Sequence, residues 1–71
     1  MEKELFEIMM DKISDEIADG KDYAKLASEC AERHPALSHL FYDLSLEEMD
    51  HMARLHNMVV DMIQTDRREH G

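Results

Sequence analysis

The sequence has little of what small proteins use to hold themselves together. Its 71 residues include one cysteine, Cys30, one proline, two glycines and no tryptophan. A single cysteine excludes a disulfide within the chain and is typical of a protein kept in a reducing cytosol. A chain below about 70–80 residues gathers only about 3–5 kcal/mol from one hydrophobic core. The remaining sources of stability are a metal ion and a partner chain.

Positive charge is also scarce, with 8 basic against 17 acidic residues and a formal net charge of −9. This balance argues against nucleic-acid binding, which needs clustered Lys and Arg, and it attracts cations. By itself it is more typical of a solvated helical surface. No apolar run approaches the ~18 residues of a membrane span, and the start MEKELFE lacks the features of an export signal. We therefore expect a cytoplasmic protein without membrane association.

One break interrupts an otherwise helical pattern, at ERHPALS over residues 32–38. Pro35 lacks a backbone donor and biases His34 away from helical geometry, yet it suits the first turn of a new helix. No strand alternation or internal repeat occurs. The sequence predicts one all-α domain, residues 1–71, folded as an antiparallel hairpin with a helix at about 2–32, a turn at 33–35 and a helix at about 36–68.

Heptad numbering predicts which side of each helix faces the other. The first helix has its inner seam at Phe6, Met9, Ile13, Glu16, Gly20, Tyr23, Ala27 and Cys30, flanked by Met10, Ile17, Ala24 and Ala31. The second helix has its seam at Leu37, Phe41, Leu44, Glu48, His51, Leu55, Met58 and Met62.

The second helix carries another mainly apolar line, roughly 150° around from its seam at ~100° per residue. This line consists of Tyr42, Leu46, Met49, Ala53, His56, Val60 and Ile63. A single neighbouring helix does not cover both faces. The pattern therefore predicts an assembly larger than one hairpin.

The polar interruptions of the two seams are Glu16, Glu48 and His51. Glu48 and His51 are three residues apart, so both leave one face of a helix. Glu16 and His51 are equally far from a turn centred between residues 33 and 34, which places all three within about 5 Å along the hairpin at ~1.5 Å per residue. Burying an uncompensated carboxylate costs several kcal/mol, so we expect a cation there.

Gly20 is almost level with Glu48 in the same register. Its missing side chain leaves room for the ligands or for close approach of the helices. Asp15 and Asp19 beside Glu16 form either an acidic approach to the site or an ordinary exposed face.

One hairpin offers two glutamates and one histidine, which is half of a di-metal ligand set. Two hairpins related by a two-fold axis make a four-helix bundle with a Glu from each of two helices and Glu-x-x-His from each of the other two. This is the ligand set of di-iron or di-manganese bundles. The sequence thus predicts a homodimer, at least, with the metal site between its subunits.

The pattern Glu16-x6-Tyr23 followed by LSLEEMDHMARL resembles the first half of rubrerythrin-type domains and other ferritin-like di-iron carboxylate proteins, over nearly the whole chain. With one hairpin rather than two, the chain is more similar still to encapsulated ferritins, whose site forms only between subunits. There is no CxxC pair, so the rubredoxin-like iron centre of full rubrerythrins is absent.

The resemblance implies that Glu16, Glu48 and His51 bind two iron ions per dimer and carry the catalysis, with manganese as the other possible metal. It implies that Tyr23 is a hydrogen-bond partner of these ligands. It further implies a ring of dimers that oxidises Fe(II) to Fe(III) for storage or detoxification and delivers it to an encapsulating shell protein.

Two other functions fit the same residues. One is a rubrerythrin-like peroxide reductase, which uses the same ligands and an external electron donor. The other is a metal-free helical oligomerisation module in which the polar residues fix the register of a dimer.

Overall fold

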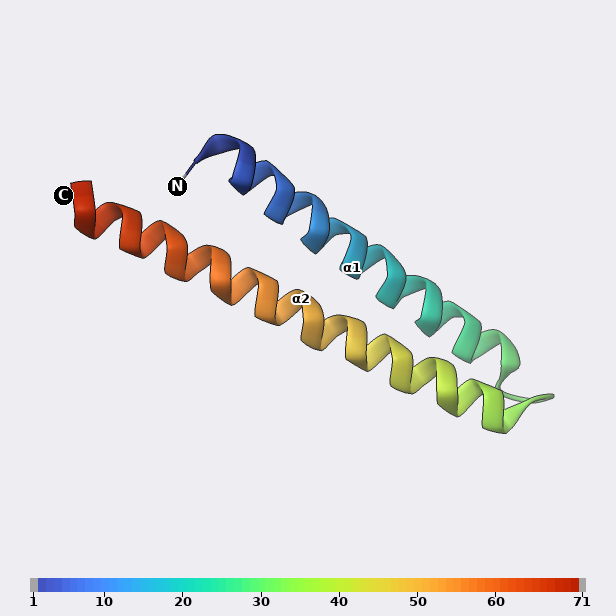
Figure 1. Cartoon of the computed structure of the whole chain (residues 1–71). Coiled ribbons are helices and arrows are strands. Elements are labelled where there is room, and N and C mark those ends of the chain that lie inside the picture. The colour runs from blue at the N-terminus through green and yellow to red at the C-terminus, as the bar shows by residue number, and fades with distance from the viewer. Residues whose placement is uncertain (1, 71) are drawn as a thin grey trace.

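The computed structural model describes residues 2–70 as two long helices joined by a tight turn (Figure 1). Helix α1 spans Lys3–Cys30 and helix α2 spans Pro35–His70. The predicted all-α hairpin is confirmed, and no strand occurs within the described residues. Its pairing with a second hairpin stays a prediction.

The turn between the helices is held by backbone and side-chain hydrogen bonds. The His34 backbone N–H donates to the Cys30 carbonyl at 2.8 Å. Pro35 then begins α2, where its missing N–H costs nothing because the first helical donors have no partner within the helix. The Ser38 hydroxyl donates to the Ala27 carbonyl at 2.6 Å and so links the two helices next to the turn. The helix ends lie within two residues of the predicted ones.

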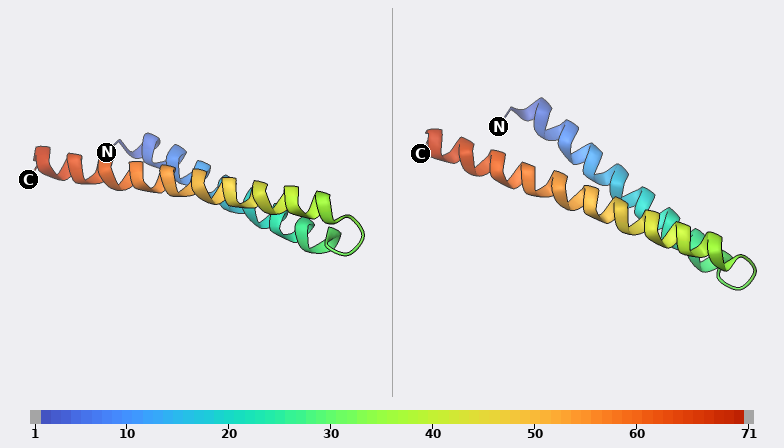
Figure 2. Two further views of the ribbon diagram at one scale, coloured as in Figure 1. Left: turned by 90° about the horizontal axis from the view of Figure 1, so that it is seen from below. Right: turned by 60° about the horizontal axis from the view of Figure 1, so that its bottom comes forward.

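The two helices run antiparallel, with both ends of the chain at the same end of the hairpin (Figures 1 and 2). Helix α2 has 36 residues against 28 in α1 and extends beyond the start of α1. The principal extents of the hairpin are 57 × 17 × 10 Å, so it is a single layer with two broad faces. Within residues 2–70, neither helix carries an apolar stretch long enough to traverse a membrane.

The inner seam of α1 follows the predicted heptad positions. Its buried or half-buried residues are Met9, Ile13, Glu16, Gly20, Tyr23, Ala27 and Cys30, at alternating steps of four and three. Phe6 is the exception, because it is 37% exposed. Phe6 lies near the open end of the hairpin, where α2 alone does not cover its ring.

The inner seam of α2 differs from the prediction at every second position. Phe41, Glu48, Leu55 and Met62 lie on it as predicted, but the intervening residues are Ser38, Ser45, Met52 and Val59. The prediction instead placed the residue that precedes each of these on the seam, namely Leu37, Leu44, His51 and Met58. Of these, Leu37, His51 and Met58 are exposed on the flank and Leu44 is half-buried.

Close helix packing explains the shift of the α2 seam. A Cβ atom added at Gly20 would lie 3.5 Å from Cβ of Glu48 and 3.7 Å from the Ser45 carbonyl oxygen. Small side chains at positions 20 and 45 thus let the backbones approach, and both residues are buried. Hydrophobicity alone favoured Leu44 over Ser45, whereas side-chain size decided which of them faces α1.

Candidate metal centre

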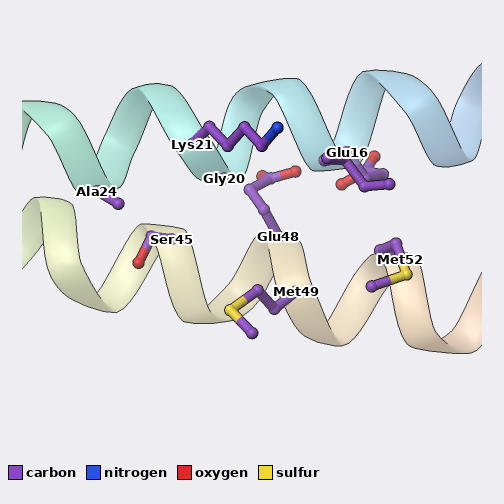
Figure 3. Close-up of a pocket in the computed structure, with 9 residues that line it drawn as sticks. Glu16, Gly20, Lys21, Ala24, Ser45, Glu48, Met49 and Met52 are labelled. Carbon is purple, nitrogen blue, oxygen red and sulfur yellow. The ribbon is translucent and has the colours of Figure 1, made fainter.

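Glu16 and Glu48 face each other near the middle of the hairpin, one from each helix. Both occupy seam positions, where the heptad steps direct a side chain toward the neighbouring helix. Figure 3 shows the two side chains extending into the space between α1 and α2, with Glu48 rising past Gly20. Their side chains are 24% and 18% exposed, so each carboxylate is partly withdrawn from water.

His51 reaches the carboxylates from the flank of α2. Its Nδ1 atom lies 3.3 Å from Oε2 of Glu16 and 3.9 Å from Oε2 of Glu48. With a proton on Nδ1, the ring donates a hydrogen bond to Glu16. The imidazole is 51% exposed, which contradicts the buried position predicted for it. The one-residue shift of the α2 seam moves His51 from the seam to the flank while leaving it within reach of both glutamates.

The three predicted ligands therefore converge. One ligand atom from each of Glu16, Glu48 and His51 lies within 4.8 Å of the other two. Two carboxylate oxygens and one imidazole nitrogen are donors that suit Fe(II), Mn(II) or Zn(II). Three donors from one chain leave further coordination positions for water, an oxidant or a second chain. The role of these residues as ligands and catalytic groups stays a prediction.

The electrostatics of Glu48 reflect this crowding. Its pKa is raised, first because Glu16 shares a hydrogen bond with it, then because partial burial disfavours its charge, and because the negative charges of Glu16 and Asp19 repel it. His51 acts in the opposite direction and lowers the pKa. The charged form of a carboxyl group is disfavoured beside another carboxylate, and it is stabilised by a nearby positive charge. A bound cation would supply that charge.

Asp15 and Asp19 differ in their relation to the site. Asp19 is exposed, and its charge contributes to the raised pKa of Glu48. Asp15 is exposed as well, but it contributes no such effect among those acting on Glu48. Of the two acidic neighbours named from the sequence, Asp19 is therefore the one whose charge acts on Glu48.

Tyr23 lies on the seam seven residues after Glu16, and its ring packs against Phe41. The ring centroids are 6.2 Å apart with an interplanar angle of 23°. Within residues 2–70 it makes no hydrogen bond to Glu16, Glu48 or His51. In the single hairpin it is a packing residue, and its hydrogen bond to the ligands of an assembled site stays a prediction.

A pocket of about 260 Å³ adjoins the carboxylates on the side of the hairpin away from His51. Glu16 and Glu48 line one end, and the rest is mainly apolar, including Ile17, Met49 and Met52. The sequence analysis missed Ser45 and Met52 as neighbours of the site. The available signal was their spacing, since they lie three residues before and four residues after Glu48 and so share its face.

Comparison with known protein families, curated proteins and solved structures gives no match to this chain.

Proposed function

We propose that this chain is a ferritin-like ferroxidase, which oxidises Fe(II) to Fe(III) at a metal site formed between two copies of the hairpin and serves iron storage or detoxification. The observation that supports this function is the convergence of Glu16, Glu48 and His51 within 4.8 Å. Manganese is a possible occupant of the same donors.

The donor set suits a metal whose oxidation state changes. Hard carboxylate oxygens from Glu16 and Glu48 favour Fe(III), while the imidazole of His51 retains affinity for Fe(II). The raised pKa of Glu48 also bears on binding, because only the ionised carboxyl group is a metal ligand. Metal binding at these residues therefore competes with protonation of Glu48.

The half-exposed position of His51 supports a shared site. A closed site within one chain would bury its imidazole, whereas the ring is 51% exposed on one flank. A second hairpin approaching this flank through a two-fold axis would bring its own Glu16, Glu48 and His51 to the same place. The resulting set would match that of di-metal four-helix bundles.

Each residue has a distinct part in the proposed reaction. When bound, two Fe(II) ions supply one electron each to the oxidant. Glu16 and Glu48 neutralise the added positive charge of the ferric product, and His51 holds its nitrogen donor toward them from the flank. The apolar side chains of Ile17, Met49 and Met52 lie on the opposite side of the carboxylates and would limit water there once a further chain covers that face.

Anaerobic titration with Fe(II), followed by exposure to oxygen, tests the proposal. We expect saturable binding of one Fe(II) per chain, a raised melting temperature, and Fe(III) formation faster than in buffer. Glu48→Ala should abolish these effects, while Glu47→Ala, which removes the exposed neighbouring carboxylate, should retain them. Equal loss in both variants would contradict a specific site.

Two further measurements separate the alternative functions. Turnover of peroxide with a reductant, exceeding turnover of Fe(II) with oxygen, would identify a peroxide reductase that uses these ligands. A melting temperature unaffected by Fe(II) or Mn(II), together with a more stable Glu48→Ala variant, would identify a metal-free oligomerisation module.

A further inference from the structure

The fold places the thioether of Met52 beside the candidate ligands. Met52 follows His51 directly in the chain and lies four residues, about one helical turn, after Glu48. It therefore shares the inward face of α2 with that glutamate and is half-buried on the seam. Figure 3 shows Met52 on α2 across from Glu16 on α1. A readily oxidised sulfur atom thus lies next to residues proposed to hold a redox-active metal.

Met52 also lines a space that small oxidants can enter. It borders the pocket of about 260 Å³ together with Glu16 and Glu48, and most of the remaining lining is apolar. This volume is well above the ~30 Å³ that one water molecule occupies in the liquid, so dioxygen and hydrogen peroxide both fit. An oxidant released at the carboxylates meets the side chain of Met52 before it reaches bulk water.

We propose that Met52 is an oxidation site, whose thioether takes up an oxygen atom from hydrogen peroxide formed at the neighbouring metal site. This inference rests on the proposed ferroxidase function. In that reaction two Fe(II) ions give two electrons to dioxygen, which takes up two protons and leaves as hydrogen peroxide. The sulfur atom of Met52 donates an electron pair to one peroxide oxygen, and the O–O bond breaks. The proton of the transferred oxygen passes to the leaving hydroxide, so the products are methionine sulfoxide and water.

Oxidation of Met52 changes the packing of the seam. Met52 lies between Glu48 and Leu55 among the half-buried residues of α2. A sulfoxide adds a polar oxygen to this apolar side chain, and a polar group withdrawn from water without a partner costs stability. The oxidised hairpin is therefore less stable, and enzymatic reduction of the sulfoxide restores it. Met52 thereby links the peroxide produced at the site to the stability of the hairpin.

Exposure and proximity to the site predict different orders of oxidation among the methionines. Peroxide in bulk water attacks the thioethers that water reaches, and Met10 and Met58 are 42% and 52% exposed. Met52 and Met62 are both half-buried on the seam of α2, so bulk peroxide should oxidise them more slowly and about equally. Met62 lies about 15 Å further along α2 at ~1.5 Å per residue. Peroxide formed at the metal site instead reaches Met52 first.

Peptide mass spectrometry after aerobic addition of Fe(II) tests this order, while absorbance of the same samples measures Fe(III). We expect sulfoxide at Met52 to exceed sulfoxide at Met62 at least about tenfold. Catalase, which removes peroxide from bulk water, should suppress oxidation of Met58 and leave that of Met52. Glu48→Ala should remove the preference for Met52. Metal-free protein treated with dilute peroxide in chelator is the reference, in which Met52 and Met62 should be oxidised alike.

The outcomes separate this inference from the ferroxidase proposal. Equal oxidation of Met52 and Met62 while the protein forms Fe(III) would overturn the oxidation site and leave the ferroxidase standing. The same preference for Met52 in metal-free protein, or its loss with catalase, would also overturn the site, because the peroxide would then come from bulk water. Fe(III) formation no faster than in buffer would overturn both proposals.

Two variants of conserved volume test the consequence for stability. Met52→Leu and Met62→Leu each keep an apolar side chain of similar size, so both should fold. After repeated cycles of Fe(II) and oxygen, followed by chelation, the melting temperature should fall in wild type and in Met62→Leu. It should stay unchanged in Met52→Leu. An equal fall in the two variants would overturn the link between Met52 oxidation and stability.

Discussion

Nδ1 of His51 lies 3.3 Å from Oε2 of Glu16, although 35 residues separate them along the chain. The contact joins the two helices near the middle of the hairpin, and Glu48 completes a group of three donor side chains. Because His51 belongs to the flank of α2 rather than its seam, this contact links the interior of the hairpin to an exposed surface. It is the feature on which the proposed shared metal site depends.

Replacement of His51 should weaken metal binding without unfolding the hairpin. His51→Ala removes the one nitrogen donor of the group, and we expect affinity for Fe(II) or Mn(II) to fall about tenfold or more. His56→Ala is the control, because His56 is another exposed histidine of α2 and lies outside the group. Calorimetric titration would measure both. Equal affinities for His51→Ala and wild type would remove His51 from the ligand set.

The stability of the metal-free hairpin should depend on pH through Glu48. Its raised pKa means that the folded state binds the proton more tightly than the unfolded chain, so the contribution to stability is fully present below the ordinary pKa of 4.5. That contribution is lost as pH rises through the raised folded-state pKa. Glu48→Gln, which cannot ionise, should lack this loss.

Thermal unfolding in chelator across this pH range would measure the effect of Glu48. The relevant quantity is the difference in melting temperature between Glu48→Gln and wild type, since other carboxyl groups titrate in both proteins. We expect this difference to favour Glu48→Gln increasingly as pH rises toward neutrality. Glu47→Gln provides the baseline for an exposed glutamate, and a difference independent of pH would contradict the prediction.

Removal of metal should reduce the size of the assembly at neutral pH. Without a cation, Glu16 and Glu48 of one copy would face Glu16 and Glu48 of the copy that shares the metal site. Like charges in a partly dry site repel strongly. Size-exclusion chromatography of chelated protein should therefore show smaller species than the metal-loaded protein. An elution profile unchanged after complete chelation would show that metal and assembly are uncoupled.

Gly20→Ala should be accommodated by the hairpin. The added Cβ would lie in ordinary van der Waals contact with Cβ of Glu48, at 3.5 Å, and alanine is favoured over glycine inside a helix by about 0.5–1 kcal/mol. We expect the free energy of unfolding to rise by about this amount, with metal affinity retained. Ala18→Gly, at an exposed position of α1, calibrates the helix-propensity difference in the same chain.

The larger substitution Gly20→Leu tests the close approach of the helices. A leucine side chain at position 20 does not fit against Ser45 unless the backbones of α1 and α2 move apart. We therefore expect Gly20→Leu to destabilise the hairpin and to weaken metal binding together. Chemical denaturation and calorimetric titration would measure these two effects. A Gly20→Leu variant as stable as Gly20→Ala would contradict the close packing at this level.

The sequence by itself determined the all-α hairpin and brought the candidate ligands to one level. Pro35 marks the change of direction, and a fixed rise per residue in each helix makes the separation of Glu16, Glu48 and His51 calculable from their distances to the turn. The heptad steps also predicted the seam of α1 from Met9 to Cys30, because its apolar and small residues recur on one face.

Only the tertiary structure decided the rotation of α2 about its axis. Both faces of this helix are apolar, so periodicity does not distinguish a seam that contains Leu44 and His51 from one that contains Ser45 and Met52. The close approach of Gly20 to Ser45 selects the second arrangement, because small residues allow the backbones to come together. That rotation leaves His51 half-exposed on one flank and places the mainly apolar pocket beside Glu16 and Glu48 on the other. Both are consequences of packing shape rather than of hydrophobic pattern.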